Sequence, residues 1–144
     1  MIKEMTEISV REMTKDDIPC LKLEHEWLRP VYYDFFEEGR GPAWVFEDQD
    51  GPIVCFGAVI LWQGVCEIWF SLIREDRNIA MIRMARKFLD EQTIRFKIRR
   101  YHCTVSDEVG ARFAKFFGFT LETPNGMKNY NPDKSTGWLY SKVI

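Results

Sequence analysis

The sequence has little of what builds metal sites and disulfide frameworks. Its two histidines lie far apart, and none of its four cysteines forms a Cys-x-x-Cys pair. This spacing matches no common metal motif, so we predict no metal cofactor. Three of the cysteines lie in apolar runs, which favours reduced core cysteines over disulfides or a metal site. The four are Cys20, Cys55, Cys66 and Cys103.

Long apolar runs are also missing. No segment approaches the roughly 18 apolar residues of a membrane helix, and residues 1–5 show no apolar run of signal-peptide type. Linkers, internal repeats, Walker loops and Ser-His-Asp elbows are absent as well. We therefore expect a cytoplasmic protein with no membrane partner, formed by one domain over residues 1–144.

The net charge of −2 conceals an asymmetry along the chain. Residues 1–76 hold seven Lys/Arg and sixteen Asp/Glu, whereas residues 77–144 hold thirteen and six. A basic helix in the second half can attract a phosphate-rich ligand, although a solvated helix face explains the charge equally well. Nucleic-acid binding is the less favoured interpretation, because it would depend on charge alone at Arg95, Lys97, Arg99 and Arg100.

The first part of the chain predicts a strand and two helices. Residues 7–13 alternate in the manner of a strand, and Thr14 suits the N-cap of a helix. We expect this helix to continue to Pro30, which closes or kinks it, and a second short helix over residues 31–38.

The remaining pattern predicts a meander followed by a strand–helix–strand unit. Apolar runs separated by an Asp-Gly and a Gln-Gly turn give three antiparallel strands over residues 43–47, 53–62 and 65–73. Two helices and three strands follow, over residues 79–96, 101–105, 107–117, 119–122 and 137–143. The strand that leaves the first of these helices is most simply parallel to the one before it. The fold class is α+β, with a mixed sheet of about seven strands and flanking helices.

The segment Ala111–Thr120 is an amphipathic helix that stops at Gly118 and turns into a strand at Phe119. With the element order, this ending resembles the GCN5-related N-acetyltransferase (GNAT) superfamily over nearly the whole chain. Similar segments occur at residues 8–17, 68–72 and 77–80. The resemblance implies acetyl-coenzyme A as co-substrate, bound where the fourth and fifth strands splay apart, and transfer of its acetyl group to a primary amine. The acceptor would be a small molecule or a protein, and a homodimer is possible.

The resemblance also implies residues that bind the coenzyme. Backbone amides at the start of the helix would hold the pyrophosphate, since a helix N-terminus offers free N–H groups and a positive dipole. Arg74 would add positive charge there. For Ser106 or Asp107 a helix cap is the favoured interpretation, and for Arg112 a solvated position is. The implied coenzyme-binding residues are Trp69, Phe70, Ser71, Leu72, Arg77, Asn78, Ile79, Ala80, Met81, Ile82, Ser106, Asp107 and Arg112.

Two departures from the family pattern weaken the implied chemistry. Asn78 and Ile82 occupy positions where the family has small residues or glycine, which let a backbone approach phosphate. Ala114 takes the position of the tyrosine that often protonates the departing thiolate. Short GNAT-like proteins of tailed bacteriophages look similar in both respects. The alternative function is therefore a catalytically degenerate phage or prophage protein with a structural or binding role.

Two residues are candidates for proton transfer. Glu67 lies early on the central strand, on the same face as Trp69 and Ser71 by alternation, and would accept the proton of the attacking amine. His102, on the next strand, would act as base or as acid. A glutamate facing water at a strand edge and a structural histidine are the competing interpretations of the two residues.

Overall fold

The computed structural model describes residues 7–23, 25–74 and 79–144. Within these residues, strands and helices follow the predicted order closely. The elements are β1 (Ser9–Glu12), the 3-10 helix η1 (Lys15–Cys20), α1 (Leu28–Glu37), β2 (Ala43–Asp48), β3 (Gly51–Trp62), β4 (Val65–Leu72), α2 (Ile79–Arg95), β5 (Arg100–Val105), α3 (Glu108–Phe116), β6 (Thr120–Leu121) and β7 (Trp138–Val143).

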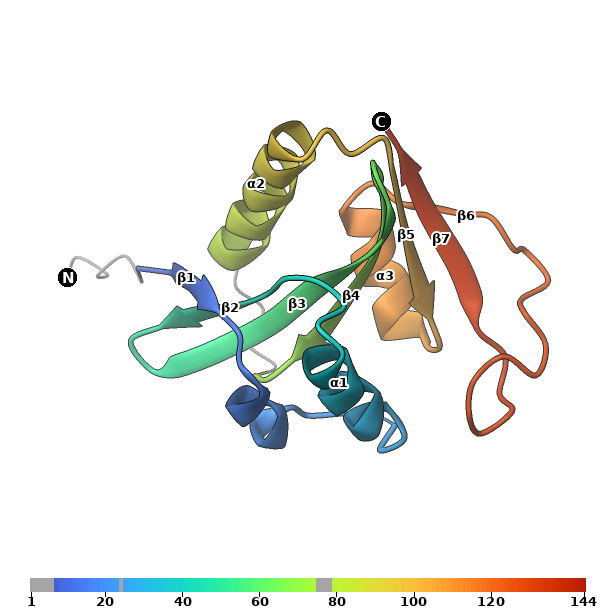
Figure 1. The fold of residues 1–144 in the computed structure, drawn as a ribbon, viewed down its shortest axis with the longest axis horizontal. Coiled ribbons are helices and arrows are strands. Elements are labelled where there is room, and N and C mark those ends of the chain that lie inside the picture. The colour runs from blue at the N-terminus through green and yellow to red at the C-terminus, as the bar shows by residue number, and fades with distance from the viewer. Residues whose placement is uncertain (1–6, 24, 75–78) are drawn as a thin grey trace. The chain divides into compact units, whose positions relative to one another are not determined.

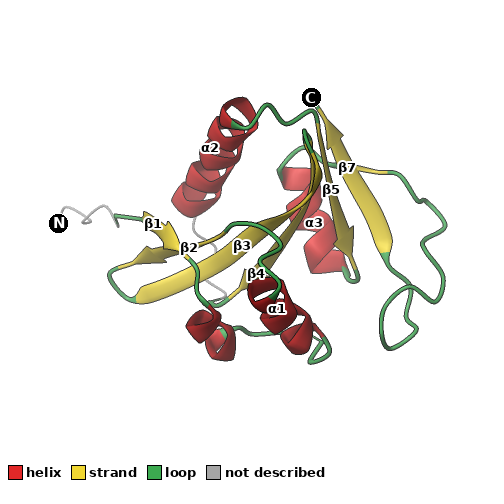
Figure 2. Cartoon of the chain, in the orientation of Figure 1, coloured by secondary structure: helices red, strands yellow, loops and turns green. Residues whose placement is uncertain are grey.

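The strands form one seven-stranded mixed sheet in the order β1-β2-β3-β4-β5-β7-β6 (Figures 1 and 2). The β4–β5 pair is parallel, whereas β1–β2, β2–β3, β5–β7 and β6–β7 are antiparallel. The parallel pair follows from the α2 connection, because a helix returns the chain to the same end of the sheet. The predicted α+β class and seven-stranded sheet are confirmed.

The chain forms two compact units. The first consists of residues 1–58 and 70–87, and the second of residues 59–69 and 88–144. Strands β3 and β4 and helix α2 each contribute residues to both units. The single domain expected over residues 1–144 stays a prediction.

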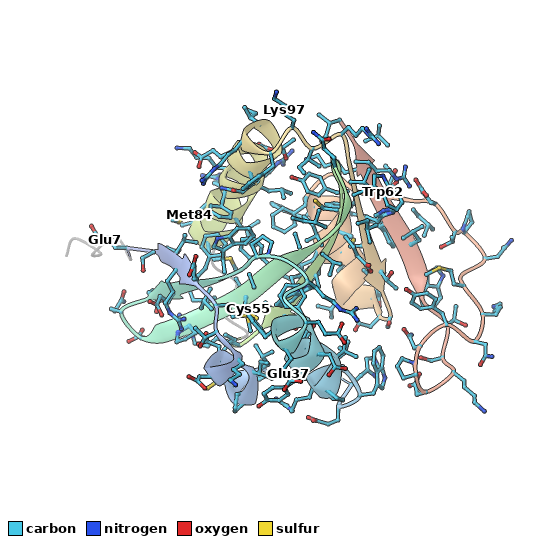
Figure 3. The ribbon with its side chains drawn as sticks, in the orientation of Figure 1. Glu7, Glu37, Cys55, Trp62, Met84 and Lys97 are labelled. Atoms are coloured by element: carbon cyan, nitrogen blue, oxygen red, sulfur yellow. The ribbon has the colours of Figure 1, made fainter. Side chains whose placement is uncertain are left out.

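The core of the first unit lies between its strands and α1. Val45, Phe46, Ile53 and Cys55 of β2 and β3 are fully buried, and the rings of Phe46 and Phe56 stack with centroids 5.1 Å apart. Figure 3 marks Cys55 within β3. The β-branched and aromatic residues among these suit strands because they pack well on a pleated surface.

The predicted first helix is wrong in its extent and in the role of Pro30. Thr14 does cap a helix, and its N–H donates to Asp17 Oδ2 at 2.9 Å. The helix is a short 3-10 helix that ends at Cys20, because Leu21 already has extended backbone angles. Pro30 lies in the first turn of α1, where its missing N–H would have no helical partner anyway. Pro30 therefore belongs to the start of a helix and does not close one.

The second unit is organised around β5. Tyr101, Cys103 and Val105 are buried on the face that α3 covers (Figure 1), and the hydroxyl of Tyr101 lies 2.8 Å from that of Thr93 in α2. Alternation along the strand places His102 on the opposite face. The strand predicted over residues 101–105 is confirmed.

The end of α3 takes the form that the sequence predicts. Gly118 has a φ of +87°, a conformation that favours glycine, and follows directly after the helix C-cap. The N–H of Phe119 then donates to the carbonyl of Ala114 at 2.9 Å, and its buried ring lies 6.4 Å from that of Tyr101. The glycine thus directs Phe119 into the core of the second unit.

Candidate functional site

The parallel ladder between β4 and β5 is short. It joins Val65–Glu67 to Arg100–His102, and its last pair is Glu67 with His102. Both strands continue past this pair, β4 to Leu72 and β5 to Val105. The two residues predicted to transfer protons are therefore neighbours on adjacent strands, at the point where the strands stop pairing.

A row of polar residues extends from this pair across the second unit. His102 pairs with Ser141 of β7, whose hydroxyl donates to Glu122 Oε1 at 2.5 Å directly after β6. Arg100, two residues before His102, donates to the same oxygen at 2.6 Å. Directly paired residues point to one face of a sheet, so Glu67, His102 and Ser141 share a face. We call Glu67, His102, Ser141 and Glu122 the polar row.

Neighbouring groups lower the pKa of Glu122 in the polar row, and burial surrounds one nitrogen of His102. The hydroxyl of Ser141 and the Arg100 guanidinium hold the pKa of Glu122 below its usual value, and the positive charge of protonated His102 acts in the same direction. The Nε2 atom of His102 is buried and has no hydrogen-bond partner among the described residues. Both nitrogens of a protonated imidazole are donors, so this atom is available to donate to a reactant.

Sequence reasoning missed three contributors to this site: Arg100, Glu122 and Ser141. Arg100 lies on the same side of its strand as His102, and the alternation of side chains along a strand is enough to predict this from the sequence. Glu122 and Ser141 enter through the register of β6 and β7, which pair Thr120 with Ser141. A long connection separates β6 from β7, so the residue pattern within either strand does not predict their register.

The predicted coenzyme strand, β4, makes several core contacts. The hydroxyl of Ser71 lies 2.6 Å from that of Tyr32, and both side chains are buried. Burial raises the pKa of Tyr32 to about 12. Trp69, Phe70 and Leu72 are half-buried. Because the hydroxyl of Ser71 is already engaged in the first unit, a coenzyme contact by this residue would come from its backbone.

The predicted pyrophosphate loop is described only in part. Arg77 and Asn78 lie outside the described residues, and Ile79 begins α2. In the first turn, Ala80 is exposed, Ile82 is half-buried and Met81 is buried in the core.

Arg74 does not supply the free positive charge expected near the loop. Its guanidinium lies 2.7 Å from Asp48 Oδ1 and 4.0 Å from Asp50. The hydrogen bond from Arg74 is the main cause that lowers the pKa of Asp48. The charge of Arg74 is therefore compensated within the first unit.

The coenzyme-binding residues predicted after β5 interact with other residues of this chain. Asp107 caps α3 by accepting from the N–H of Gly110 at 2.7 Å, so the capping interpretation is confirmed. Ser106 accepts from the side-chain amide of Asn131 at 3.0 Å. Arg112 is exposed and lies 3.4 Å from Glu108 one helical turn away.

Ala114 is buried on the inner face of α3, with 1% of its surface exposed. A tyrosine at this position would place a much larger side chain in the core. The packing of α3 therefore favours a small side chain at the position where the family often has its tyrosine acid.

Three further features concern metal binding, membrane helices and the basic residues considered for nucleic-acid binding. In the parts of the chain that the structure describes, no group of three His, Cys, Asp or Glu side chains is arranged to hold a metal ion. No helix among the same residues is long and apolar enough to cross a membrane. Arg100 is paired with Glu122, and Arg95 lies 5.3 Å from the ring of Phe96, so two of the four basic residues considered for nucleic acid have partners of their own.

Solved acetyltransferase structures share this fold. The ribosomal-protein-S5-alanine acetyltransferase of Vibrio fischeri has a TM-score of 0.67 and 15% identity, over 98% of this chain and 95% of that chain. A variant of the spermidine N-acetyltransferase of Vibrio cholerae has a TM-score of 0.65 and 12% identity, over 94% and 93%. A ribosomal alpha-N-protein acetyltransferase in complex with coenzyme A has a TM-score of 0.68 and 15% identity, over 95% and 94%.

The chain therefore has the GNAT fold, as the resemblance predicted. No family model matches the sequence, and no curated protein matches it either. At these identities the structural likeness shows the fold, and the activity must be argued from the residues of this chain.

Proposed function

We propose that this protein is a GNAT-type N-acyltransferase that transfers the acetyl group of acetyl-coenzyme A to a primary amine. The observation that carries the proposal is the pairing of Glu67 with His102 at the last step of the β4–β5 ladder. A carboxylate and an imidazole that are neighbours can share the two proton transfers that amine acylation requires.

Acetyl-coenzyme A would supply the acyl thioester that the amine attacks. The β4–β5 pairs end at Glu67, and β4 continues through Ile68 and Trp69 without pairing to β5. Arg74 is not part of this proposal, because Asp48 already engages it.

The proposed proton transfers balance within the Glu67–His102 pair. The carboxylate of Glu67 accepts the proton of the amine as its nitrogen attacks the thioester carbon. The carbon–sulfur bond then breaks, and protonated His102 donates from Nε2 to the departing sulfur. Glu67 returns its proton to the neighbouring His102, so both groups regain their starting states. The products are the N-acetylated amine and the free thiol.

His102 takes the role of acid in this proposal because Ala114 cannot. A methyl side chain carries no proton, and this one lies in the core of the second unit. The unpartnered Nε2 of His102 favours the same assignment, since a donor already bonded within the protein would be a poorer acid.

Substitution of the pair tests the proposal. We expect Glu67→Gln and His102→Gln each to lower kcat by about 10²–10⁴-fold, the range for loss of one acid or base. Release of coenzyme thiol would be followed with a panel of amines, in a Cys20→Ser background because Cys20 is an exposed thiol. His25→Gln is the matched control. Full turnover in both Glu67→Gln and His102→Gln would refute these roles.

The competing proposal is a non-catalytic GNAT-like module with a structural or binding role, of the kind that phages encode. Buried Ala114 favours it, since the usual acid has no place in the core. Titration calorimetry with acetyl-coenzyme A separates the two. Binding with turnover supports the enzyme, binding without turnover for any amine supports the module, and no binding excludes acetyl transfer.

A further inference from the structure

Three segments meet at one end of the second unit. They are the hairpin tip between β3 and β4, the connection between α2 and β5, and the chain at the end of β7 (Figure 1). The carbonyl of Gly64 accepts from the N–H of Arg99 at 2.8 Å, and the carbonyl of Arg99 accepts from the N–H of Ile144 at 3.0 Å. We call residues 60–64, 94–99 and 143–144 the exposed end.

Large apolar side chains gather at the exposed end and are open to solvent. Trp62 at the hairpin tip is 60% exposed, and Ile94 near the end of α2 is 80% exposed. Figure 3 labels Trp62 and Lys97, which both belong to this end. A group of exposed apolar residues marks an interaction site, whereas single ones do not. The apolar side chains are Ile60, Leu61, Trp62, Ile94, Phe96 and Val143.

The charged side chains of the exposed end are all positive. Arg95, Lys97 and Arg99 are exposed, and none of them has an ion-pair partner among the residues that the structure describes. The guanidinium of Arg95 lies 5.3 Å from the ring of Phe96, a contact that leaves its charge in place. A ligand of this end must therefore combine apolar groups with negative charge. No Asp or Glu occurs in the stretches that contain the end, residues 59–66, 92–106 and 134–144.

We propose that the exposed end is a docking surface for an anionic lipid bilayer. Aromatic rings such as that of Trp62 suit the boundary between acyl chains and headgroups, and basic neighbours attract anionic headgroups. Peripheral binding of this kind needs no spanning helix. It departs from the expectation of no membrane partner, which came from the lack of long apolar runs. The surface does not rest on the proposed acetyl transfer.

Other occupants use this surface less fully. A second copy of the chain in a twofold arrangement would bring the cations of both copies together, and like charges oppose association. Single-stranded nucleic acid would suit the cations and the two aromatic rings, but it would leave Ile60, Ile94 and Val143 in water. A partner helix would dock in a groove, whereas the exposed end consists of the tips of a hairpin, a helix and a strand. A bilayer uses the aliphatic, aromatic and basic side chains together.

Sedimentation of the full chain with vesicles tests the proposal. We expect the protein to sediment with phosphatidylcholine vesicles that contain phosphatidylserine, and not with vesicles of phosphatidylcholine alone. Added salt should release it, because screening weakens the attraction between exposed cations and headgroups. Equal binding to both kinds of vesicle, or binding to neither, would overturn the proposal.

Loss of positive charge should weaken this binding. Lys97→Gln combined with Arg99→Gln removes two cations, and we expect partition onto the phosphatidylserine vesicles to fall by about 10–30-fold. The matched control combines Lys115→Gln with Lys128→Gln, which removes two exposed lysines outside the exposed end. An equal fall in both double variants would show an effect of net charge alone and would overturn the proposal.

Trp62→Ser tests the apolar part of the surface. We expect partition to fall by about tenfold or more, because a large apolar side chain no longer enters the lipid. Tyr130→Ser is the control, since Tyr130 is an exposed aromatic residue elsewhere in the second unit. Thermal unfolding would establish that both variants are folded. Unchanged binding in folded Trp62→Ser would overturn the proposal.

Two further measurements identify a different occupant. Sedimentation velocity without lipid would overturn the proposal if the wild type is a dimer and Trp62→Ser is a monomer, since a second copy would then cover the surface. Binding of single-stranded DNA that is lost in Trp62→Ser, without sedimentation on vesicles, would overturn it in favour of nucleic acid. None of these outcomes depends on whether an amine is acetylated.

Discussion

The cysteines illustrate how position changes the chemistry of one residue type. Cys55, Cys66 and Cys103 are buried, whereas Cys20 is exposed, and all four are free thiols. Burial raises the pKa of Cys55 and of Cys103 to about 12 and raises that of Cys66. The expected placement in the core is confirmed for Cys55, Cys66 and Cys103.

The resulting prediction concerns thiol reactivity. The thiolate is the nucleophilic form, so a buried thiol with a raised pKa reacts slowly near neutral pH. At pH 8 a disulfide reagent should modify only Cys20 rapidly in the native protein and all four thiols in denaturant, as followed by absorbance. In Cys20→Ser the rapid phase should disappear. Rapid modification of two thiols in the native state would contradict the buried placement.

Helix α3 shows what an element requires of its residues. Its N-terminus is capped by Asp107, its C-terminus is followed by Gly118, and Ala114 is buried against the second unit. The small side chain at position 114 lets the helix pack closely on β5, because protein interiors leave little spare volume.

This packing predicts the outcome of restoring the tyrosine typical of the family. Ala114→Tyr should destabilise the protein by about 1–3 kcal/mol, the usual cost of overpacking a core. Urea denaturation would measure the loss. Val109→Tyr is the control, since Val109 is exposed on the same helix and should tolerate the larger side chain. Unchanged stability of Ala114→Tyr together with gained turnover would show that the site retains room for the usual acid.

At the scale of the whole molecule, charges connect elements that are distant in sequence. Arg11 of β1 bonds Asp17 of η1 at 2.7 Å and Glu47 of β2 at 3.1 Å. The hydrogen bond from Arg11 is the main cause that lowers the pKa of Asp17 below its ordinary value of 3.8. Because the folded pKa is the lower one, this contribution to stability is present above about pH 4 and is lost as the pH falls through the folded value.

The acid dependence of unfolding tests this connection. From pH 7 to pH 3, the free energy of unfolding should fall less in Asp17→Asn than in the wild type, because the variant has already lost the ionic partner. Urea midpoints at several pH values give the comparison. Asp16→Asn, its exposed neighbour, should retain the wild-type slope. Equal slopes in Asp17→Asn and the wild type would show that the Arg11–Asp17 pair contributes nothing.

Local patterns were enough to predict most elements. Alternation gave the strands, and turn residues such as Gly51 and Gly64 separated them, because these signals depend on residues close in sequence. The role of Pro30 was predicted wrongly, since a proline suits both the end of one helix and the first turn of the next. Only the extended backbone at Leu21 distinguishes the two cases.

By itself, the sequence determined the α+β class, the helix ending at Gly118 and the candidates Glu67 and His102, because each depends on periodicity or on the nature of a single residue. The tertiary structure decided that Glu67 and His102 are neighbours, that Glu122 and Ser141 join them, and that Arg74 is already paired with Asp48. Those facts depend on strand register and on contacts between distant segments. Register is set by the packing of the whole sheet, which no local pattern contains.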